Sequence, residues 1–129
     1  VCQESLSDLL PYLDAANIDL KSFSDEIYMK VSGGHLQPVL DTILAMHDSG
    51  VWIELTNLLI PGINDDMSMI RRMCQWIVSN GLADNPLHFS RFFPRYKMQD
   101  IPPTPIQTLK NAKQIALEEG IKYVYLGNV

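Results

Sequence analysis

Polar and charged side chains alternate with apolar ones in the segment Asn17-Ile-Asp-Leu-Lys. Because successive side chains of a β-strand point to opposite faces, Asn17, Asp19 and Lys21 would share one face. A carboxylate and an amine two residues apart can bind a zwitterionic ligand. The same two groups can instead form an ion pair at the rim of a sheet, since an inward-facing charge is costly unless it is paired. The pattern predicts one of these two arrangements.

A second candidate lies in the apolar segment Val51–Ile60, where Thr56 and Asn57 interrupt the hydrophobic run. Polar residues inside such a run are candidates for ligand contacts. The Pro61-Gly62 pair that follows favours a type II turn. Asn64, with two Asp residues after it, predicts the N-cap of a helix.

Aromatic and basic residues mix in the segment 88–97, HFSRFFPRYK. Rings can stack on a nucleoside base, while Arg and Lys bind carboxylate or phosphate groups. The alternative is a hydrophobic plug flanked by solvated cations. A nucleic-acid groove is not expected, because its three basic residues, Arg91, Arg95 and Lys97, stand against a formal net charge of −5 for the chain.

Composition narrows the function classes further. No apolar run approaches the ~20 residues of a membrane-spanning helix, so no membrane partner is expected. Two cysteines form no disulfide framework, which predicts a reducing, cytoplasmic location. The three histidines are scattered without metal-ligand spacing, and no metal-binding residue is predicted. Glycine-rich dinucleotide and P-loop motifs are absent.

The elements that must position these residues follow from apolar periodicity. Strands are predicted over Ala16–Leu20, Val51–Ile60, Leu87–Arg91 and Tyr123–Leu126. Helices are predicted over Ser5–Leu10, from Ser24, over Pro38–Ser49, from an Asn64 cap to Gly81, and from a Thr104 cap to Gly120. Strands that alternate with helices form a parallel sheet. It is either an open doubly wound sheet or an arc of a βα barrel, and both place chemistry at the C-terminal ends of the strands.

Three motifs in this order resemble the C-terminal half of radical S-adenosylmethionine enzymes of the pyruvate formate-lyase activating type: Asn17-Ile-Asp-Leu-Lys, then Val51-Trp-Ile-Glu-Leu-Thr with Ile60-Pro-Gly-Ile-Asn-Asp, then His88-Phe-Ser-Arg-Phe with Pro94-Arg-Tyr-Lys-Met. Among these enzymes, the AmmeMemoRadiSam system branch is the most similar, and the closing residues 120–129 also fit it. The resemblance implies an α/β fold whose parallel βα units form part of a (β/α)6 partial TIM-type barrel. Residues 1–129 would be the C-terminal portion of that barrel domain.

The resemblance also implies a chemistry: a [4Fe–4S] cluster cleaves S-adenosylmethionine reductively, and the resulting radical abstracts a hydrogen atom, in activating enzymes from a partner protein. Asp19 and Lys21 would lie near the methionine moiety of the cofactor, and Thr56 near a polar cofactor contact. The stretch after Ser90 would face the adenine. The complete set of cofactor-binding residues expected is Asp19, Lys21, Thr56, Asn57, Ser90, Arg91, Phe92 and Phe93.

Two departures from the family pattern bear on activity. The three-cysteine loop that binds the cluster and the glycine-rich strand are absent from the chain, and both are expected to precede Val1. Relatives commonly carry a His where Phe92-Phe93 stands. The expectation is therefore a fragment that binds neither cofactor and holds no catalytic residue. It would self-associate through exposed sheet edges, rearrange, or keep its core only through the outer helices. Two alternatives remain: a stand-alone nucleotide- or protein-binding module using the rim Arg91–Lys97, and an aldolase-like enzyme with Lys21 as its Schiff base.

Overall fold

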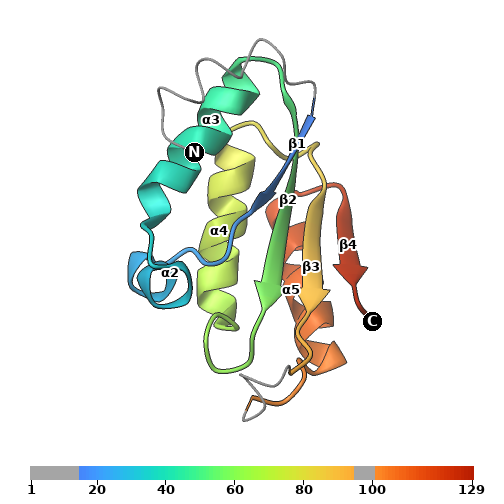
Figure 1. Cartoon of the computed structure of the whole chain (residues 1–129). Coiled ribbons are helices and arrows are strands. Elements are labelled where there is room, and N and C mark those ends of the chain that lie inside the picture. Colours follow the sequence, from blue (N-terminus) through green and yellow to red (C-terminus); the bar gives the residue numbers. More distant parts are fainter. Residues whose placement is uncertain (1–14, 95–100) are drawn as a thin grey trace.

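The computed structural model describes residues 15–94 and 101–129, which form a parallel sheet with helices packed along it (Figure 1). The four strands are β1 (Ala15–Asp19), β2 (Trp52–Leu59), β3 (Leu87–Arg91) and β4 (Val124–Gly127). All three strand pairings are parallel. The predicted α/β class with parallel βα units is thus confirmed. The helix predicted over Ser5–Leu10 falls outside the described residues.

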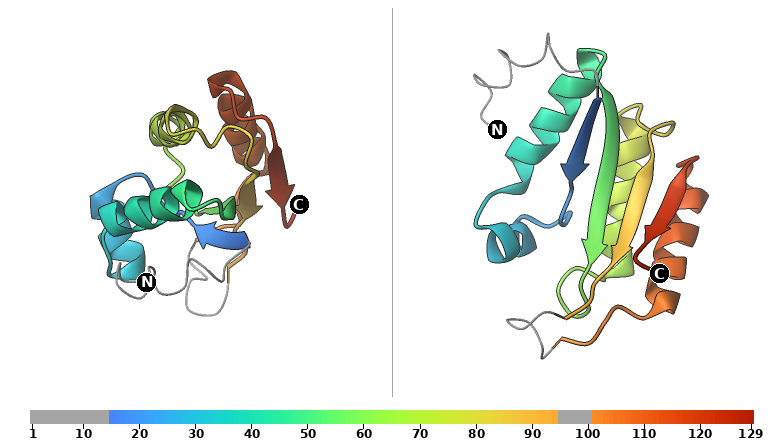
Figure 2. Two further views of the ribbon diagram at one scale, coloured as in Figure 1. Left: turned by 90° about the horizontal axis from the view of Figure 1, so that it is seen from above. Right: turned by 45° about the vertical axis from the view of Figure 1, so that its right-hand side comes forward.

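The order of the strands decides between the two sheet types. Along the sheet the order is β1-β2-β3-β4, the same as in the chain. A doubly wound sheet reverses direction at a switch point and carries helices on both faces. Strands added in one direction through right-handed crossovers place every helix on one face. Figure 2 shows the helices on one side of the sheet, so the described sheet is an arc with one covered and one open face.

The first two helices pack together at the β1 end of the sheet. Helix α2 (Asp25–Ser32) begins at the predicted Ser24, whose hydroxyl accepts a hydrogen bond from the Ile27 N–H. Helix α3 (Leu36–Asp48) begins two residues before the predicted Pro38. Its first N–H, that of Leu36, is bound at 2.9 Å by the carboxylate of Asp25. Pro38 is tolerated in that first turn because N–H groups there have no partner within the helix.

The start of helix α4 (Met67–Ser79) corrects a prediction. Its N-cap is Asp66, whose carboxylate accepts a hydrogen bond from the Ser68 N–H at 2.9 Å, and not Asn64. Asn64 lies two residues earlier, where its side chain binds three backbone groups of the β1 and β2 ends. These tertiary hydrogen bonds occupy the Asn64 side chain, which the local sequence had predicted to cap helix α4.

Helix α5 (Ile106–Glu119) gives a second correction. It begins one residue later than predicted, after Pro105, and Thr104 provides no cap. The Thr104 hydroxyl instead accepts from the Phe92 N–H at 2.9 Å and donates to the Leu59 carbonyl. Gly120 ends the helix as predicted, with a φ of 107° that favours glycine.

The covered face of the sheet and the inner sides of the helices make the core. Side chains of Ile53, Leu55 and Leu59 from β2 are buried there, and so is Phe89 from β3. Small residues on α5, Ala112 and Ala116, are fully buried and let that helix approach the sheet closely. Full burial of one such aliphatic or aromatic side chain stabilises the fold by about 1.5–3 kcal/mol. The opposite face of the sheet, which no described helix covers, carries the more polar side chains of the strands.

No helix among residues 15–94 and 101–129 is long and apolar enough to cross a membrane.

Candidate functional site on the open face of the sheet

The open face of the sheet carries a row of polar side chains, one from each strand. The register pairs Asp19 of β1 with Thr56 of β2, Thr56 with His88 of β3, and His88 with Tyr125 of β4. On β2 the buried and more accessible positions alternate, so Glu54 and Thr56 face away from the helices. The row therefore joins residues that are far apart in the sequence.

These residues line a hollow of about 450 Å³. Its walls come from all four strands and contain Asn17, Asp19, Glu54, Thr56, His88, Ser90, Tyr125, Leu126 and Gly127. Gly127 packs closely against β3, since a Cβ there would lie 3.2 Å from the Ser90 hydroxyl oxygen and would require that side chain to shift. Three of the predicted cofactor contacts, Asp19, Thr56 and Ser90, are thus brought together.

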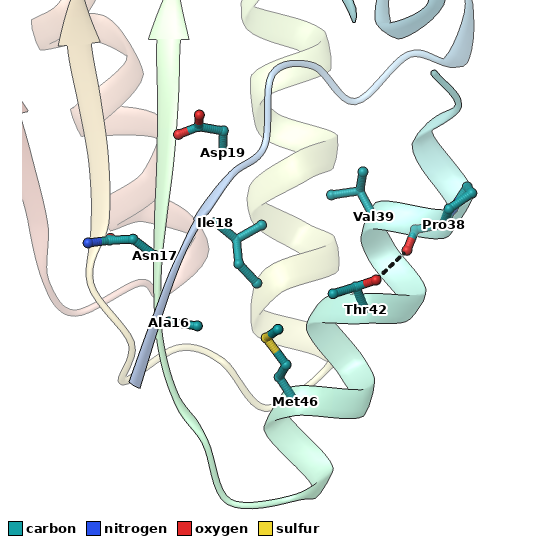
Figure 3. A pocket seen from close by; sticks show the side chains of 8 residues that line it. All are labelled: Ala16, Asn17, Ile18, Asp19, Pro38, Val39, Thr42 and Met46. Carbon is teal, nitrogen blue, oxygen red and sulfur yellow. Dashed lines mark hydrogen bonds between the residues drawn. The ribbon is translucent and has the colours of Figure 1, made fainter. Parts of the chain in front are cut away.

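The predicted alternation on β1 is observed in part. Asn17 and Asp19 share the open face, and Figure 3 shows both turned away from helix α3. Lys21 lies beyond the end of the strand; it is exposed and does not line the hollow. No ion pair joins Asp19 to Lys21, both of which the structure describes. The rim ion pair considered from the sequence is therefore not formed.

Asn57 is a predicted contact that the structure places elsewhere. It follows Thr56 on β2 and points to the covered face, where it is fully buried. Its amide donates to the Leu20 carbonyl at 2.7 Å, while its Oδ1 has no hydrogen-bond partner. Asn57 therefore holds the end of β1 from the covered face of the sheet and does not line the hollow.

Asn64 completes this support. Its amide nitrogen donates to the carbonyls of Lys21 at 2.7 Å and Leu58 at 2.8 Å, and its Oδ1 accepts from the Ile60 N–H at 2.7 Å. These bonds fasten the backbone that carries Lys21 to the end of β2. The Ile60-Pro-Gly-Ile-Asn stretch is thus a structural clamp for the β1 end.

The aromatic and basic segment divides between core and surface. Phe92 is buried, with 6% of its surface accessible, whereas Phe93 is 46% exposed. The Arg91 guanidinium lies 4.8 Å from the centre of the Phe93 ring, and its Nε donates to the Thr104 carbonyl at 2.7 Å. Arg91 is therefore already engaged by the protein. Arg95 and Lys97 lie outside the described residues.

Glu54, His88 and Tyr125 line the hollow but are not among the predicted cofactor contacts. His88 Nε2 lies 2.8 Å from a carboxylate oxygen of Glu54, and the His88 ring stacks on Tyr125 with centroids 5.3 Å apart. Glu54 lies two residues from Thr56, and His88 two residues from Ser90, just as Asn17 lies two residues from Asp19. This spacing places both side chains on the same face of a strand and could have identified Glu54 and His88. A search confined to strand ends passes over these mid-strand positions.

The described residues show no group of three or more His, Cys, Asp or Glu that could hold a metal ion. Cys74 is buried on α4, as predicted, and burial raises the pKa of its thiol to about 12, with a further contribution from the negative charge of Glu119. Thiolate is the form that binds iron or zinc. Residues 15–94 and 101–129 therefore do not fit an iron–sulfur cluster.

A second hollow, of about 320 Å³, lies between β1 and α3 (Figure 3). Its lining is mainly apolar, with Ile18 turned toward Val39 and Met46 of the helix. The hydroxyl of Thr42 is used within α3, where it donates to the Pro38 carbonyl at 2.9 Å. This groove runs beside the outer edge of β1, which pairs only with β2 among the described strands.

Comparisons with known proteins bear mainly on the fold. No protein-family model matches the chain. The sequence is 46% identical over 117 residues to the uncharacterized protein MJ0808 of Methanocaldococcus jannaschii, an alignment that covers 91% of this chain and 35% of that protein. The chain thus spans about a third of the length of this curated relative.

A solved structure, a domain of a pyruvate-formate lyase-activating enzyme from Bacteroides vulgatus, superposes with a TM-score of 0.83 at 16% identity. The match covers 98% of this chain and 74% of that one. The α/β fold with four parallel strands alternating with helices therefore resembles a domain of a pyruvate-formate lyase-activating enzyme.

Proposed function

We propose that this chain forms one wall of the S-adenosylmethionine site of a radical S-adenosylmethionine protein of the pyruvate formate-lyase activating type. The observation that carries the proposal is the meeting of Asp19, Thr56 and Ser90 in one hollow on the open face. They belong to three motifs that resemble that family, and they come from three different strands. A fold like that of an activating-enzyme domain supports the same assignment.

The polar residues suit the two ends of the cofactor. The methionine moiety is a zwitterion, which the carboxylate of Asp19 and the ammonium of Lys21 complement at the β1 end. Phe93, exposed beyond β3, offers a ring on which adenine can stack. Asn57 and Asn64 act as positioning residues, because they hold the backbone of Leu20 and Lys21 from the covered side.

The reaction itself needs more than the described residues. Hydrogen-atom abstraction by S-adenosylmethionine chemistry would need one electron from a reduced [4Fe–4S] cluster to break the cofactor's 5′ C–S bond, with methionine as the leaving group. The described residues do not fit that cluster, so its cysteine ligands come from elsewhere in the functional protein. A partner protein is the proposed substrate, as in activating enzymes. This chain contributes binding and orientation of the cofactor.

In contrast to the expectation from the sequence, the hollow predicts that the chain alone still binds S-adenosylmethionine. The proposal is tested by titrating S-adenosylmethionine into the isotope-labelled chain and following backbone amide resonances. Binding should shift signals of the β1 and β3 ends. Asp19→Asn and Lys21→Gln should each weaken it about tenfold, the effect of losing one charge-assisted hydrogen bond. Asp84→Asn and Lys110→Gln are matched controls on exposed positions away from the hollow and should leave it unchanged.

Two results would count against the cofactor site. Equal weakening by the control variants would show that only overall charge matters. Binding of adenosine monophosphate as tight as that of S-adenosylmethionine, insensitive to Asp19→Asn, would favour a stand-alone nucleotide-binding module instead.

A further inference from the structure

The arrangement of Glu54, His88 and Tyr125 has a chemistry of its own. The carboxylate of Glu54 lies 2.8 Å from His88 Nε2, and each of the two side chains is about one-third exposed, at 35% and 33%. The Tyr125 ring lies against the imidazole, 5.3 Å between centroids and 28° between planes. The imidazole is therefore oriented by a hydrogen bond at one edge and by a ring at one face.

This orientation fixes which nitrogen is available. A carboxylate accepts hydrogen bonds only, so the neutral imidazole beside Glu54 carries its proton on Nε2. Nδ1 then holds a lone pair, and no described residue forms a hydrogen bond with it. Since the ring lines the open-face hollow, a ligand is the natural partner of this nitrogen.

We propose that His88 is a proton-transfer residue of the open face, with Glu54 as its positioning residue, for a ligand that carries an ionisable hydroxyl, amine, thiol or acidic C–H group. In the forward step the bond from hydrogen to the ligand breaks, the ligand keeps the electron pair, and a bond forms between that hydrogen and Nδ1. The imidazolium charge is compensated by Glu54. The reverse step returns the proton. This role goes beyond the cofactor contacts and does not depend on them.

The surroundings favour a proton acceptor over an anion site. The charged or titratable groups that face His88 are Glu54 from β2, Asp19 from β1 and Tyr125 from β4. Among the residues that the structure describes, no Lys or Arg lines the hollow, and the helices lie behind the opposite face. Carboxylates beside an imidazole stabilise the charge that it gains on taking up a proton.

The chain contains a matched control. His35 also lies beside a carboxylate, with Nδ1 3.3 Å from Asp25, but this pair is on the surface, with side chains 61% and 56% exposed. Within the described part of the chain no ring stacks on His35, and His35 lines neither of the two hollows. Any activity that needs the hollow should depend on His88 and be indifferent to His35.

The test uses 5-nitrobenzisoxazole as a probe, because its ring opening requires only a base: the C–H proton moves to the base, the N–O bond breaks, and a coloured cyanophenolate forms. The chain should accelerate the reaction over buffer. His88→Gln should lower that acceleration at least about tenfold, below the 10²–10⁴ of evolved acid–base catalysis. His35→Gln should leave it within about twofold, the difference expected when no catalytic group is lost.

Glu54→Gln separates positioning from structure. It keeps an oxygen near Nε2 but removes the charge, so the rate should fall and the pH–rate profile should move, while His35→Gln leaves the profile in place. Equal rates for wild type and His88→Gln, with both folded by circular dichroism, would overturn the proposal. Nitrogen-15 spectra of the wild-type imidazole provide a check independent of any variant: a neutral His88 protonated on Nδ1 would equally overturn it.

Discussion

The side chain of Asn64 donates a hydrogen bond to the backbone carbonyl of Lys21 at 2.7 Å, across 43 residues of sequence. This bond fastens the end of β1, where two predicted cofactor contacts lie, to the loop after β2. Asn64 is almost fully buried and bonds with three backbone groups in all. Its role is thus to fix a rim of the open face, although it touches no part of the hollow.

Replacing Asn64 tests this clamp. Asn64→Ala would leave one buried N–H and two carbonyls without their partner, and should lower the free energy of unfolding by about 2–4 kcal/mol. Urea denaturation measures the loss. Asn111→Ala removes an amide that bonds only with Gln107 on the exposed side of α5, and should cost under about 0.5 kcal/mol. A cost for Asn64→Ala as small as that of Asn111→Ala would show that the clamp contributes no stability.

The fold was predictable because its signals are local and repeated. The predicted strands are rich in apolar or β-favouring residues, most clearly Val51–Ile60, and turns or helix caps separate them. The two wrong caps show where local signals fail. Asn64 and Asp66 are both good N-cap residues, and the choice between them depends on backbone groups of β1 that are distant in sequence.

The site was predictable only at the strand ends. Asp19 was identified as a polar residue near a strand end, where the chemistry of parallel sheets gathers. Thr56 was identified as a polar residue that interrupts an apolar run. The contact of Glu54 with His88 depends on the register of β2 against β3, which a single sequence does not specify. Asn57 was misplaced for a different reason: adjacent residues of a strand point to opposite faces, so Thr56 and Asn57 could not both line the hollow.

Thr104 should behave as a bridge between strands rather than as a helix cap. Thr104→Val keeps the shape but removes the hydroxyl that serves Phe92 N–H and the Leu59 carbonyl, so we expect a loss of about 1–3 kcal/mol. Thr104→Ser retains the hydroxyl and should cost about 1 kcal/mol, the effect of one methyl group. Chemical denaturation measures both losses. A loss for Thr104→Val no larger than that for Thr104→Ser would show that the hydroxyl contributes no stability through these two hydrogen bonds.

Cys74 should be inert in the folded chain. Burial raises the pKa of its thiol to about 12, so the reactive thiolate is scarce at neutral pH, and the sulfur is also inaccessible. In a Cys2→Ser background, Ellman's reagent at pH 8 should release no thionitrobenzoate until urea unfolds the protein. Rapid release under native conditions would contradict the packing described for α4.

Asp25 should make stability depend on acid pH. The pKa of its carboxyl is lowered from 3.8, first by the hydrogen bond from the Leu36 N–H and then by His35. A lowered folded-state pKa contributes stability that is present above the unfolded value, near 3.9, and is lost as pH falls through the folded value. The difference in unfolding free energy between wild type and Asp25→Asn should therefore be constant from pH 7 to 5 and shrink below pH 4. A difference that stays constant down to pH 2.5 would contradict this linkage.

The outer edge of β1 should pair with a second copy of the chain. In a parallel ladder the N–H groups of alternate residues point to the same neighbour. The Leu20 N–H points to β2, since it donates to the Thr56 carbonyl, so those of Asn17 and Asp19 point to the open edge. Unpaired edge groups are a template for strand pairing.

We therefore expect concentration-dependent association in sedimentation experiments. Asn17→Pro removes one outward donor while sparing the bonds to β2, as proline does on edge strands, and should weaken association with little effect on melting. A monodisperse monomer at all concentrations, or association unchanged in Asn17→Pro, would show that this edge is not the interface.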